Sequence, residues 1–340
     1  MKADIRDFIW YDPDVGVESL HIWGLPGSGK SNLALHLVDL AMKGTQDKVL
    51  LRGDRFAEWQ HFLLRPNTKL HLVIPAEAAG KYRYIIPKGS HPSVEEMHYW
   101  LEQEYKVTVT TDDSYEYIQN NPMSYFENHD IVILMDVNFP LGQKGWFWSK
   151  VFRSLLNRFE FTDRAITYLD HEAGILFPEI ALSESKEAKN HWKAVNDVCE
   201  SFVDFRKGLI RTILISQLEG EINWRIRQKC MYSIIKQGIA GRNMPKQIIK
   251  EAPRQRIDQF ICVIGRELFT RENIAPKYPE ISPRLKVIPL DVIELIEPEK
   301  EEEDTHECLN CGHTWRARVS YPKQCPNCKT TKKSIQEIEI

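Results

Sequence analysis

The sequence lacks any hydrophobic run long enough to cross a membrane. Its apolar runs, such as Ile131–Met135 and Ile213–Ile215, have the length of strands, whereas a spanning helix needs about 20 apolar residues. The N-terminal Met1–Asp4 is polar, which does not fit a secretory signal. A net charge of only -3 excludes a uniformly basic coat, although a local basic patch can still bind nucleic acid. We therefore expect a cytoplasmic protein without a membrane segment.

Cysteine is scarce outside one short stretch. Cys199, Cys230 and Cys262 are scattered among apolar neighbours, so we expect them to be buried thiols. The remaining four of the seven cysteines form two close pairs after residue 305. This pattern favours metal binding in a reducing compartment over a disulfide framework.

An acidic segment divides the chain. Six of the eight residues from Glu297 to Asp304 are acids, so segment 297–305 is expected to be a solvated linker. Before it, over residues 1–296, apolar strands alternate with amphipathic helices, which predicts an α/β domain with a mostly parallel sheet covered on both faces. After it, residues 306–334 carry the paired cysteines. We find no internal repeats.

The apolar patterning places the main elements of the first domain. Ser93 is expected to cap a helix, with Glu96 completing a capping box. Predicted helices cover Ser31–Met42, Ser93–Tyr105, Trp146–Phe159 and His191–Phe205, and predicted strands cover Leu20–Trp23, Lys48–Arg52, Leu70–Ile74, Tyr82–Ile86, Ile131–Met135, Ile166–Leu169 and Leu209–Ile215.

A glycine-rich motif follows the first strand and opens the first helix. The motif has the pattern G-x4-G-K-S/T, in which glycines let backbone N–H groups turn inward to phosphate oxygens. Lys30 is expected to reach the β- and γ-phosphates of ATP, and the Ser31 hydroxyl to bind Mg²⁺. The motif predicts a nucleoside-triphosphatase whose nucleotide contacts are Gly24, Pro26, Gly27, Ser28, Gly29, Lys30, Ser31 and Asn32.

Polar residues end three of the predicted strands, where ligands of open α/β sheets collect. Asp170 is expected to hold Mg²⁺ through water, and Glu172 to act as the base that polarises the attacking water. Gln217 is expected to sense the γ-phosphate. For Asp136 we favour a polar cap on a core strand, because aspartate usually lies at the surface. A GTPase is disfavoured because no guanine-reading (N/T)-K-x-D motif is present.

The cysteine pairs have the spacing of a zinc ribbon. Each C-x2-C pair forms a tight turn that presents two thiolates, and two such turns complete a tetrahedral, structural Zn²⁺ site. The pattern assigns the four ligands to Cys308, Cys311, Cys325 and Cys328. Basic and aromatic residues around them leave two roles open, nucleic-acid contact and protein docking.

A second charge feature lies between Arg225 and Arg256. This segment holds nine lysines and arginines against one acid, Glu251. Such a cluster can neutralise phosphates and bind DNA without sequence preference, although charge runs are more often solvated helix faces. The basic residues are Arg225, Arg227, Lys229, Lys236, Arg242, Lys246, Lys250, Arg254 and Arg256.

The order of these motifs over residues 15–275 resembles the HerA/FtsK superfamily of ATP-driven DNA pumps. The resemblance rests on the P-loop, the strand Ile131–Asp136, the strand ending Leu169-Asp170-His171-Glu172-Ala173, the strand ending Ile215-Ser216-Gln217, and Ile222–Arg227. It implies a RecA-like core that hydrolyses ATP and assembles into a ring, usually a hexamer, around double-stranded DNA. His171 departs from the family pattern, in which the two acids are adjacent. Arg225 and Arg227 are the nearest candidates for a trans-acting arginine finger, and either can instead contact DNA.

Two other functions remain open. The first is a regulatory P-loop ATPase whose hydrolysis controls a protein partner without moving DNA. The second is a small-molecule kinase, which the strand-end Gln217 and the zinc ribbon disfavour.

Overall fold

The computed structural model divides into two compact units, Met1–Ile288 and Pro289–Ile340. Among the described residues, no helix combines the length and apolar character that crossing a membrane requires. Most of the predicted linker 297–305, together with Cys325 and Arg242, lies outside the described residues. The structure describes residues 8, 16–53, 58–63, 67–85, 92–136, 139, 141–157, 164–180, 183–238, 246–256, 259–264, 267–272, 286–289, 305–308, 310–312, 314–316, 327–328 and 335–338.

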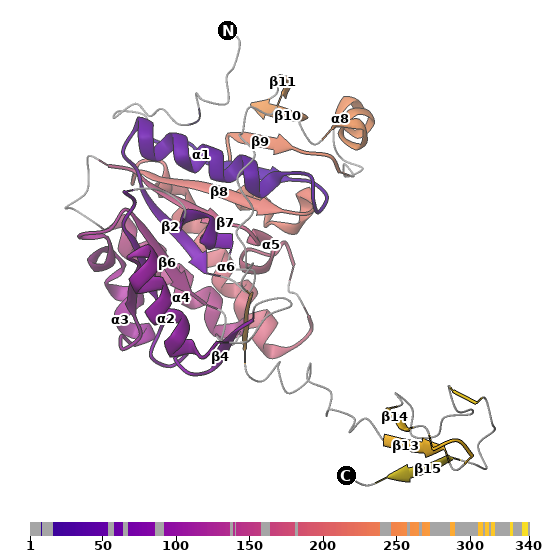
Figure 1. Cartoon of the computed structure of the whole chain (residues 1–340). Helices are drawn as coiled ribbons and strands as arrows, with labels where there is room; N and C mark the ends of the chain where they lie inside the picture. Colours follow the sequence, from indigo (N-terminus) through magenta and orange to yellow (C-terminus); the bar gives the residue numbers. More distant parts are fainter. Residues whose placement is uncertain are drawn as a thin grey trace. The chain divides into compact units, whose positions relative to one another are not determined.

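The first unit is built on a ten-stranded sheet with the order β11-β10-β9-β1-β8-β7-β2-β6-β3-β5 (Figure 1). Strands β10 and β11 run antiparallel at one edge, and the other eight strands are parallel. The mostly parallel sheet predicted from the sequence is therefore confirmed. The strands are β1 Leu20–Trp23, β2 Lys48–Gly53, β3 Leu70–Val73, β5 Thr108–Thr110, β6 Ile131–Met135, β7 Ile166–Asp170, β8 Ile210–Ser216, β9 Tyr232–Ile235, β10 Gln259–Ile264 and β11 Glu267–Glu272.

Helices cover both faces of this sheet. Side chains alternate along the central strands, so that Leu51 and Ile133 pack with helices α1 and α2, whereas Leu50 and Leu134 pack with α4 and α6. Burial on both faces explains why these strands are continuously apolar. The α-helices are α1 Lys30–Gly44, α2 Val94–Tyr105, α3 Tyr115–Asn120, α4 Leu141–Leu156, α5 Ala173–Leu176, α6 Lys186–Phe205, α7 Trp224–Arg227 and α8 Lys246–Glu251. Short 3-10 helices are η2 Glu58–Phe62, η3 Pro122–Phe126, η4 Glu219–Glu221 and η5 Ala252–Arg254.

The predicted start of helix α4 is wrong. Helix α4 begins at Leu141, five residues before the predicted Trp146, and ends at Leu156. Its first turns contain Gly142 and Gly145, which have low helix propensity and obscure the pattern. A Cβ on Gly145 would lie 2.9 Å from the Ala194 Cβ on α6. The glycine therefore lets the two helices approach closely.

Helix caps explain two other boundaries. Ser93 caps α2 through the predicted capping box: its Oγ accepts from the Glu96 amide at 3.1 Å, and Glu96 Oε2 accepts from the Ser93 amide at 2.8 Å. Helix α6 begins at Lys186 instead of the predicted His191, because Ser185 Oγ caps it by accepting from the Ala188 amide at 3.1 Å. A serine N-cap of this kind is a normal helix start.

Two small sheets complete the fold. Strand β4 (Tyr82–Ile85) pairs with β12 (Lys286–Pro289). In the second unit, β13 (Thr305–Cys308) lies between β14 (Thr314–Arg316) and β15 (Ile335–Ile338), and both neighbours run antiparallel to it. Strand β15 thus extends the cysteine-containing sheet past residue 334, the predicted end of the ribbon.

Candidate nucleotide-binding site and cysteine cluster

The bend between β1 and α1 is shaped by glycines. Gly24, Gly27 and Gly29 have φ angles of 153°, 75° and 83°, which residues with a side chain rarely adopt. A Cβ on Gly24 would also lie 2.9 Å from the Gln237 carbonyl oxygen, which accepts a 2.7 Å hydrogen bond from the Leu25 amide. The bend therefore lies against the segment after β9, and its first position requires glycine.

This bend fits a bound phosphate. Helix α1 has no acid in its first turn, so the positive end of its dipole is available to an anion. Ser28 Oγ is buried and has no hydrogen-bond partner among the described residues, although buried hydroxyls are normally satisfied. A phosphate oxygen would supply the acceptor. Pro26 lies at the exposed tip, and Ser31 and Asn32 are half-buried on the first turn of α1.

The Lys30 ammonium lies over the start of the bend. Its Nζ donates to the carbonyl oxygens of Gly24 and Leu25 at 2.7 and 2.9 Å. Burial lowers the pKa of Lys30, while the charges of Glu172 and Glu221 act to raise it. The charge of the lysine therefore interacts with acids that follow two neighbouring strands, β7 and β8. This is expected of a lysine that lies between a phosphate site and the acids used for hydrolysis.

Asp170 is the last residue of β7 and is 1% exposed. Its Oδ1 accepts from Arg52 Nη1 at 3.1 Å and from the Glu172 amide at 2.9 Å, and its Oδ2 accepts from the Tyr168 hydroxyl at 3.1 Å. Each carboxylate oxygen can accept further hydrogen bonds. Asp170 is thus held in one orientation at the carboxyl end of the sheet.

Glu172 lies at the N-terminus of α5, two residues after Asp170. Burial raises the pKa of Glu172, and the charge of Asp170 adds to this effect, whereas Arg52 and Lys30 lower it. A carboxylate with a raised pKa is a stronger base than an exposed one. The structure therefore brings Glu172 into the electrostatic environment of Lys30 even though His171 separates it from Asp170.

Gln217 follows β8 and is exposed. Its backbone N–H donates to Glu221 Oε2 at 2.8 Å. The Glu221 side chain lies beside the α carbon of Gly174 in α5, where a Cβ would come within 2.9 Å of it. Glu221 thus connects the turn after β8 to the turn after β7. Sequence reasoning missed Glu221, although its position four residues after Gln217 in a short loop was a usable signal.

Two hydrogen bonds of Ser216 also hold the turn after β8. The His21 Nε2–Ser216 Oγ distance is 2.8 Å, and Ser216 Oγ donates to the Leu218 carbonyl oxygen at 2.8 Å. Burial lowers the pKa of His21 to about 3, so the imidazole is neutral at pH 7 and donates to the serine. Because His21 belongs to β1, its hydrogen bond connects the strand before the bend to Ser216, the residue before Gln217.

Asp136 is a buried ion-pair partner, and the expectation of a surface cap was wrong. It is 1% exposed at the end of β6. Its Oδ2 accepts from Arg52 Nε at 2.7 Å and from Trp148 Nε1 at 3.0 Å, and its Oδ1 accepts from Lys144 Nζ at 3.2 Å. Burial acts to raise the pKa of Asp136, but Arg52 and Lys144 bring it below its usual value. Sequence reasoning also missed Arg52, whose charge after the apolar run Val49–Leu51 of β2 was the available signal.

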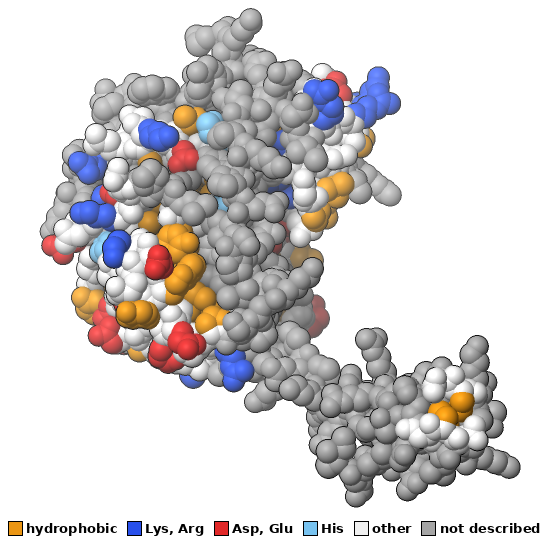
Figure 2. All heavy atoms as spheres, viewed as in Figure 1, with side chains coloured by type: hydrophobic (Ala, Val, Ile, Leu, Met, Phe, Trp, Pro, Cys, Tyr) orange, Lys and Arg blue, Asp and Glu red, His pale blue; other side chains and the backbone are white. Residues whose placement is uncertain are grey.

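The basic segment divides into paired and exposed residues. Arg227 forms ion pairs with Glu179 and Glu219, and Lys236 is buried and donates to the Gln259 carbonyl oxygen at 2.8 Å. These two residues are structural. Lysine and arginine side chains gather over α8 (Figure 2). The exposed basic residues of the segment are Arg225, Lys229, Lys246, Lys250, Arg254 and Arg256.

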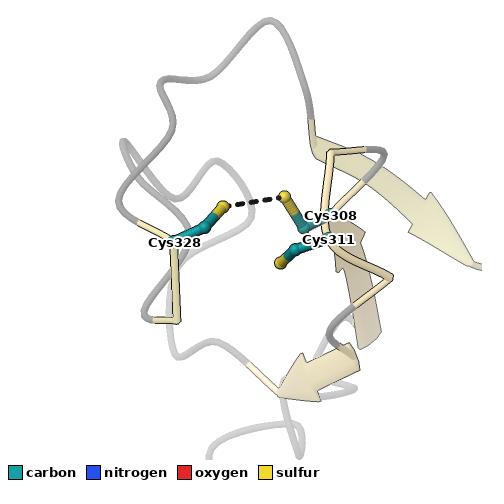
Figure 3. Close-up of side chains that lie close together, drawn as sticks. All are labelled: Cys308, Cys311 and Cys328. Carbon is teal, nitrogen blue, oxygen red and sulfur yellow. Dashed lines mark hydrogen bonds between the residues drawn. The ribbon is translucent and has the colours of Figure 1, made fainter.

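In the second unit, Cys308, Cys311 and Cys328 point toward one another (Figure 3). Their sulfur atoms all lie within 4.8 Å, and the Cys308–Cys328 Sγ distance is 3.5 Å. A tetrahedral site with Zn–S bonds of about 2.3 Å places its sulfurs about 3.8 Å apart. The Gly312 amide closes the first turn on the Cys308 carbonyl oxygen at 2.8 Å. Three thiols in this arrangement fit a metal ion.

Comparison with known proteins gives structural matches only. No family model and no curated protein sequence matches the chain. Among solved structures, the genome packaging NTPase B204 from Sulfolobus turreted icosahedral virus 2, in complex with ATP-gammaS, is 12% identical, with a TM-score of 0.44 over 78% of this chain and 100% of that chain. The plasmid coupling protein TrwB with ADP and Mg²⁺ is 11% identical, with a TM-score of 0.47 over 80% and 88%. VirB4 of Thermoanaerobacter pseudethanolicus is 15% identical, with a TM-score of 0.47 over 76% and 90%.

The fold assignment stands on the chain's own geometry, because a glycine bend joins β1 to α1 within a mostly parallel sheet covered by helices. That is the RecA-like core predicted from the sequence.

Proposed function

We propose that this chain is an ATP-hydrolysing DNA translocase of the HerA/FtsK type. One observation carries the proposed ATP hydrolysis: the glycine bend leaves the buried Ser28 Oγ without a partner among the described residues and holds Lys30 Nζ on its first two carbonyl oxygens, where the charge of Glu172, beyond the tip of β7, acts on the lysine. Binding and hydrolysis need Lys30 and Glu172 to face one phosphate. A cytoplasmic location suits Cys199, Cys230 and Cys262, which form no disulfide.

Residues of the bend bind the nucleotide in this proposal. The amides from Gly27 to Asn32 receive the phosphate oxygens, and Lys30 exchanges its two carbonyl contacts for the β- and γ-phosphates. The Ser31 hydroxyl and the Asp170 carboxylate, the latter through water, are oxygen donors of the kind that Mg²⁺ prefers. Bound Mg²⁺ would neutralise charge that develops on the phosphate oxygens.

Residues at the strand ends supply the chemistry. Glu172 accepts a proton from a water molecule, whose oxygen bonds to the γ-phosphorus while the bond to the ADP oxygen breaks. The raised pKa of Glu172 suits that task. Gln217 senses the γ-phosphate, and its hydrogen bond to Glu221 carries the change to the loop before α7.

The exposed basic residues over α8 and at Arg225 and Lys229 are the proposed contact with double-stranded DNA. Phosphate contacts by such residues are independent of sequence and weaken with salt, as a sliding motor requires. We propose further that copies of the chain form a ring, usually a hexamer, in which Arg225 is the better placed of the two arginine-finger candidates because Arg227 is paired.

The cysteine cluster is proposed to hold structural Zn²⁺ through Cys308, Cys311, Cys325 and Cys328. Metal analysis of purified protein should find about one zinc per chain, and a chelator should release it. Cys311→Ser should lower the zinc content without reducing ATP hydrolysis by the first unit. Full zinc content in that variant would show that the metal sits elsewhere.

Phosphate release with and without double-stranded DNA tests the function. DNA should stimulate hydrolysis at 50 mM salt, and the stimulation should fall steeply toward 200 mM. Light scattering with ATP and DNA should show an assembly larger than the monomer. A rate of hydrolysis that DNA does not change, in a protein that stays monomeric, would instead favour the regulatory ATPase.

A further inference from the structure

One arginine joins the two strands that end in aspartate. Arg52 lies on β2, which pairs with β6 on one side and β7 on the other. Its Nε donates to Asp136 Oδ2 at 2.7 Å, and its Nη1 donates to Asp170 Oδ1 at 3.1 Å. The Arg52 side chain is 3% exposed and both aspartates are 1% exposed. A guanidinium can make both contacts because its donors are fixed in a planar fork.

Arg52 also holds the turn between the two proposed catalytic acids. Its Nη1 donates to the Glu172 carbonyl oxygen at 3.3 Å, while the Glu172 amide donates to Asp170 Oδ1 at 2.9 Å. Arg52, Asp170 and the backbone of Glu172 therefore form a closed hydrogen-bonded ring. The turn inside this ring contains His171, the residue that separates the acids.

The charges of this cluster are balanced. Asp136 and Asp170 supply two negative charges, and Arg52 and Lys144 supply two positive charges. Asp136 accepts hydrogen bonds from Arg52, Lys144 and Trp148, and the first two are cations that offset its charge. Its role is to hold Arg52 from the side opposite Asp170.

We propose that Arg52 is a positioning residue of the nucleotide site, which directs the Asp170 carboxylate and fixes the turn that carries Glu172. The inference rests on the proposed ATP hydrolysis and deepens it. Arg52 itself is buried below the strand ends and acts only through the two acids. A buried ion pair contributes little net stability compared with apolar packing, so stability alone gives no reason for three buried charges at this place.

The same sheet offers a matched control at its other end. Arg211, near the start of β8, donates from Nε to Asp47 Oδ2 at 3.2 Å, and both side chains are 0% exposed. Asp47 also accepts from Thr167 Oγ1 at 2.7 Å. This site shares the buried arginine–aspartate pair of the Arg52 cluster but has one aspartate instead of two, and it lies at the amino ends of the strands.

Steady-state ATP hydrolysis at varied Mg²⁺ by Arg52→Lys and Arg211→Lys tests the proposal. Lysine keeps the charge but loses the fork. Arg52→Lys should lower kcat and raise the Mg²⁺ concentration for half-maximal activity, each by at least about tenfold, as loss of a partner that orients a metal-binding group typically does. ATP affinity measured without metal should change less than about twofold, because the hydrogen bonds that the structure describes for Arg52 go to Asp136, Asp170 and Glu172 and not to the bend. Arg211→Lys should lower the thermal midpoint and leave both kinetic quantities unchanged.

A second variant, Asp136→Asn, tests the proposal if Arg52→Lys does not fold. Asp136→Asn keeps an acceptor for Arg52 but removes the charge that holds it, and should raise the Mg²⁺ requirement by about threefold or more. An unchanged Mg²⁺ requirement in either folded variant, or an equal change in Arg211→Lys, would overturn the positioning role. A wild-type protein that does not hydrolyse ATP would instead overturn the proposed function, and this inference with it.

Discussion

The two ends of the central sheet use the same buried ion pair in different surroundings. At the amino end, Arg211 pairs with a single aspartate, Asp47, and contacts the carbonyl oxygen and ring of Phe8. At the carboxyl end, Arg52 meets Asp136 and Asp170 close to the phosphate-binding bend. A buried arginine–aspartate pair therefore does not by itself mark a functional site. The unsatisfied Ser28 hydroxyl and the raised pKa of Glu172 are what distinguish the carboxyl end.

The largest expected effect is the loss of ATP hydrolysis when the bend at the carboxyl end of the sheet is changed. Lys30→Ala removes the ammonium that would contact the β- and γ-phosphates, so ATP hydrolysis should fall to background. The fold should be kept, because Lys30 donates only to two loop carbonyls. Phosphate release and circular dichroism check both points, and substantial hydrolysis by the variant would place the nucleotide elsewhere.

The next effect concerns the base. Glu172→Gln keeps the shape of the side chain but cannot take a proton, so kcat should fall by roughly 10² to 10⁴. ATP should still bind, because the phosphate contacts lie on the bend. Single-turnover hydrolysis measures the chemical step, and equilibrium binding of ATP measures the binding step. Normal turnover would remove Glu172 from the mechanism.

At the amino end, the expected effect is on stability alone. Arg211→Met leaves Asp47 buried without its cation, which should cost about 3–5 kcal/mol of the free energy of unfolding. Urea denaturation measures this loss, and kcat at a temperature where the variant is folded should match the wild type. A change in kcat would contradict the division between the two ends.

The smallest effect is a pH dependence. Because the pKa of Glu172 is raised, kcat/KM should fall on acidification with a midpoint above 4.5, as the base becomes protonated in the free enzyme. The same shift means that the buried carboxylate costs stability as pH rises through its folded pKa. Glu172→Gln should therefore raise the thermal midpoint at pH 7 but not below pH 4.5.

Local signals made much of this fold predictable. The strands β1, β6 and β7 and the glycine bend are continuous in sequence, and they lie where the apolar runs and the motif predicted them. The capping box of Ser93 was equally local. The antiparallel edge strands β10 and β11 were not predicted, because their pairing depends on the rest of the sheet.

The contacts within the site depend on strand order, which the sequence does not state. Arg52 is 84 residues from Asp136 and 118 residues from Asp170, and the three meet only because β2 lies between β6 and β7. Asp136 was expected at the surface for the same reason, because its partner Arg52 lies far from it in the sequence. The P-loop and the cysteine turns were found early because each needs only a few consecutive residues.

Calorimetric titration of ATPγS in the presence of Mg²⁺ tests the central claim most directly. If the carboxyl-end bend is the nucleotide site, the wild type and Arg211→Lys should bind with equal affinity, and Lys30→Ala should bind far more weakly. Equal binding by Lys30→Ala and the wild type would contradict the account.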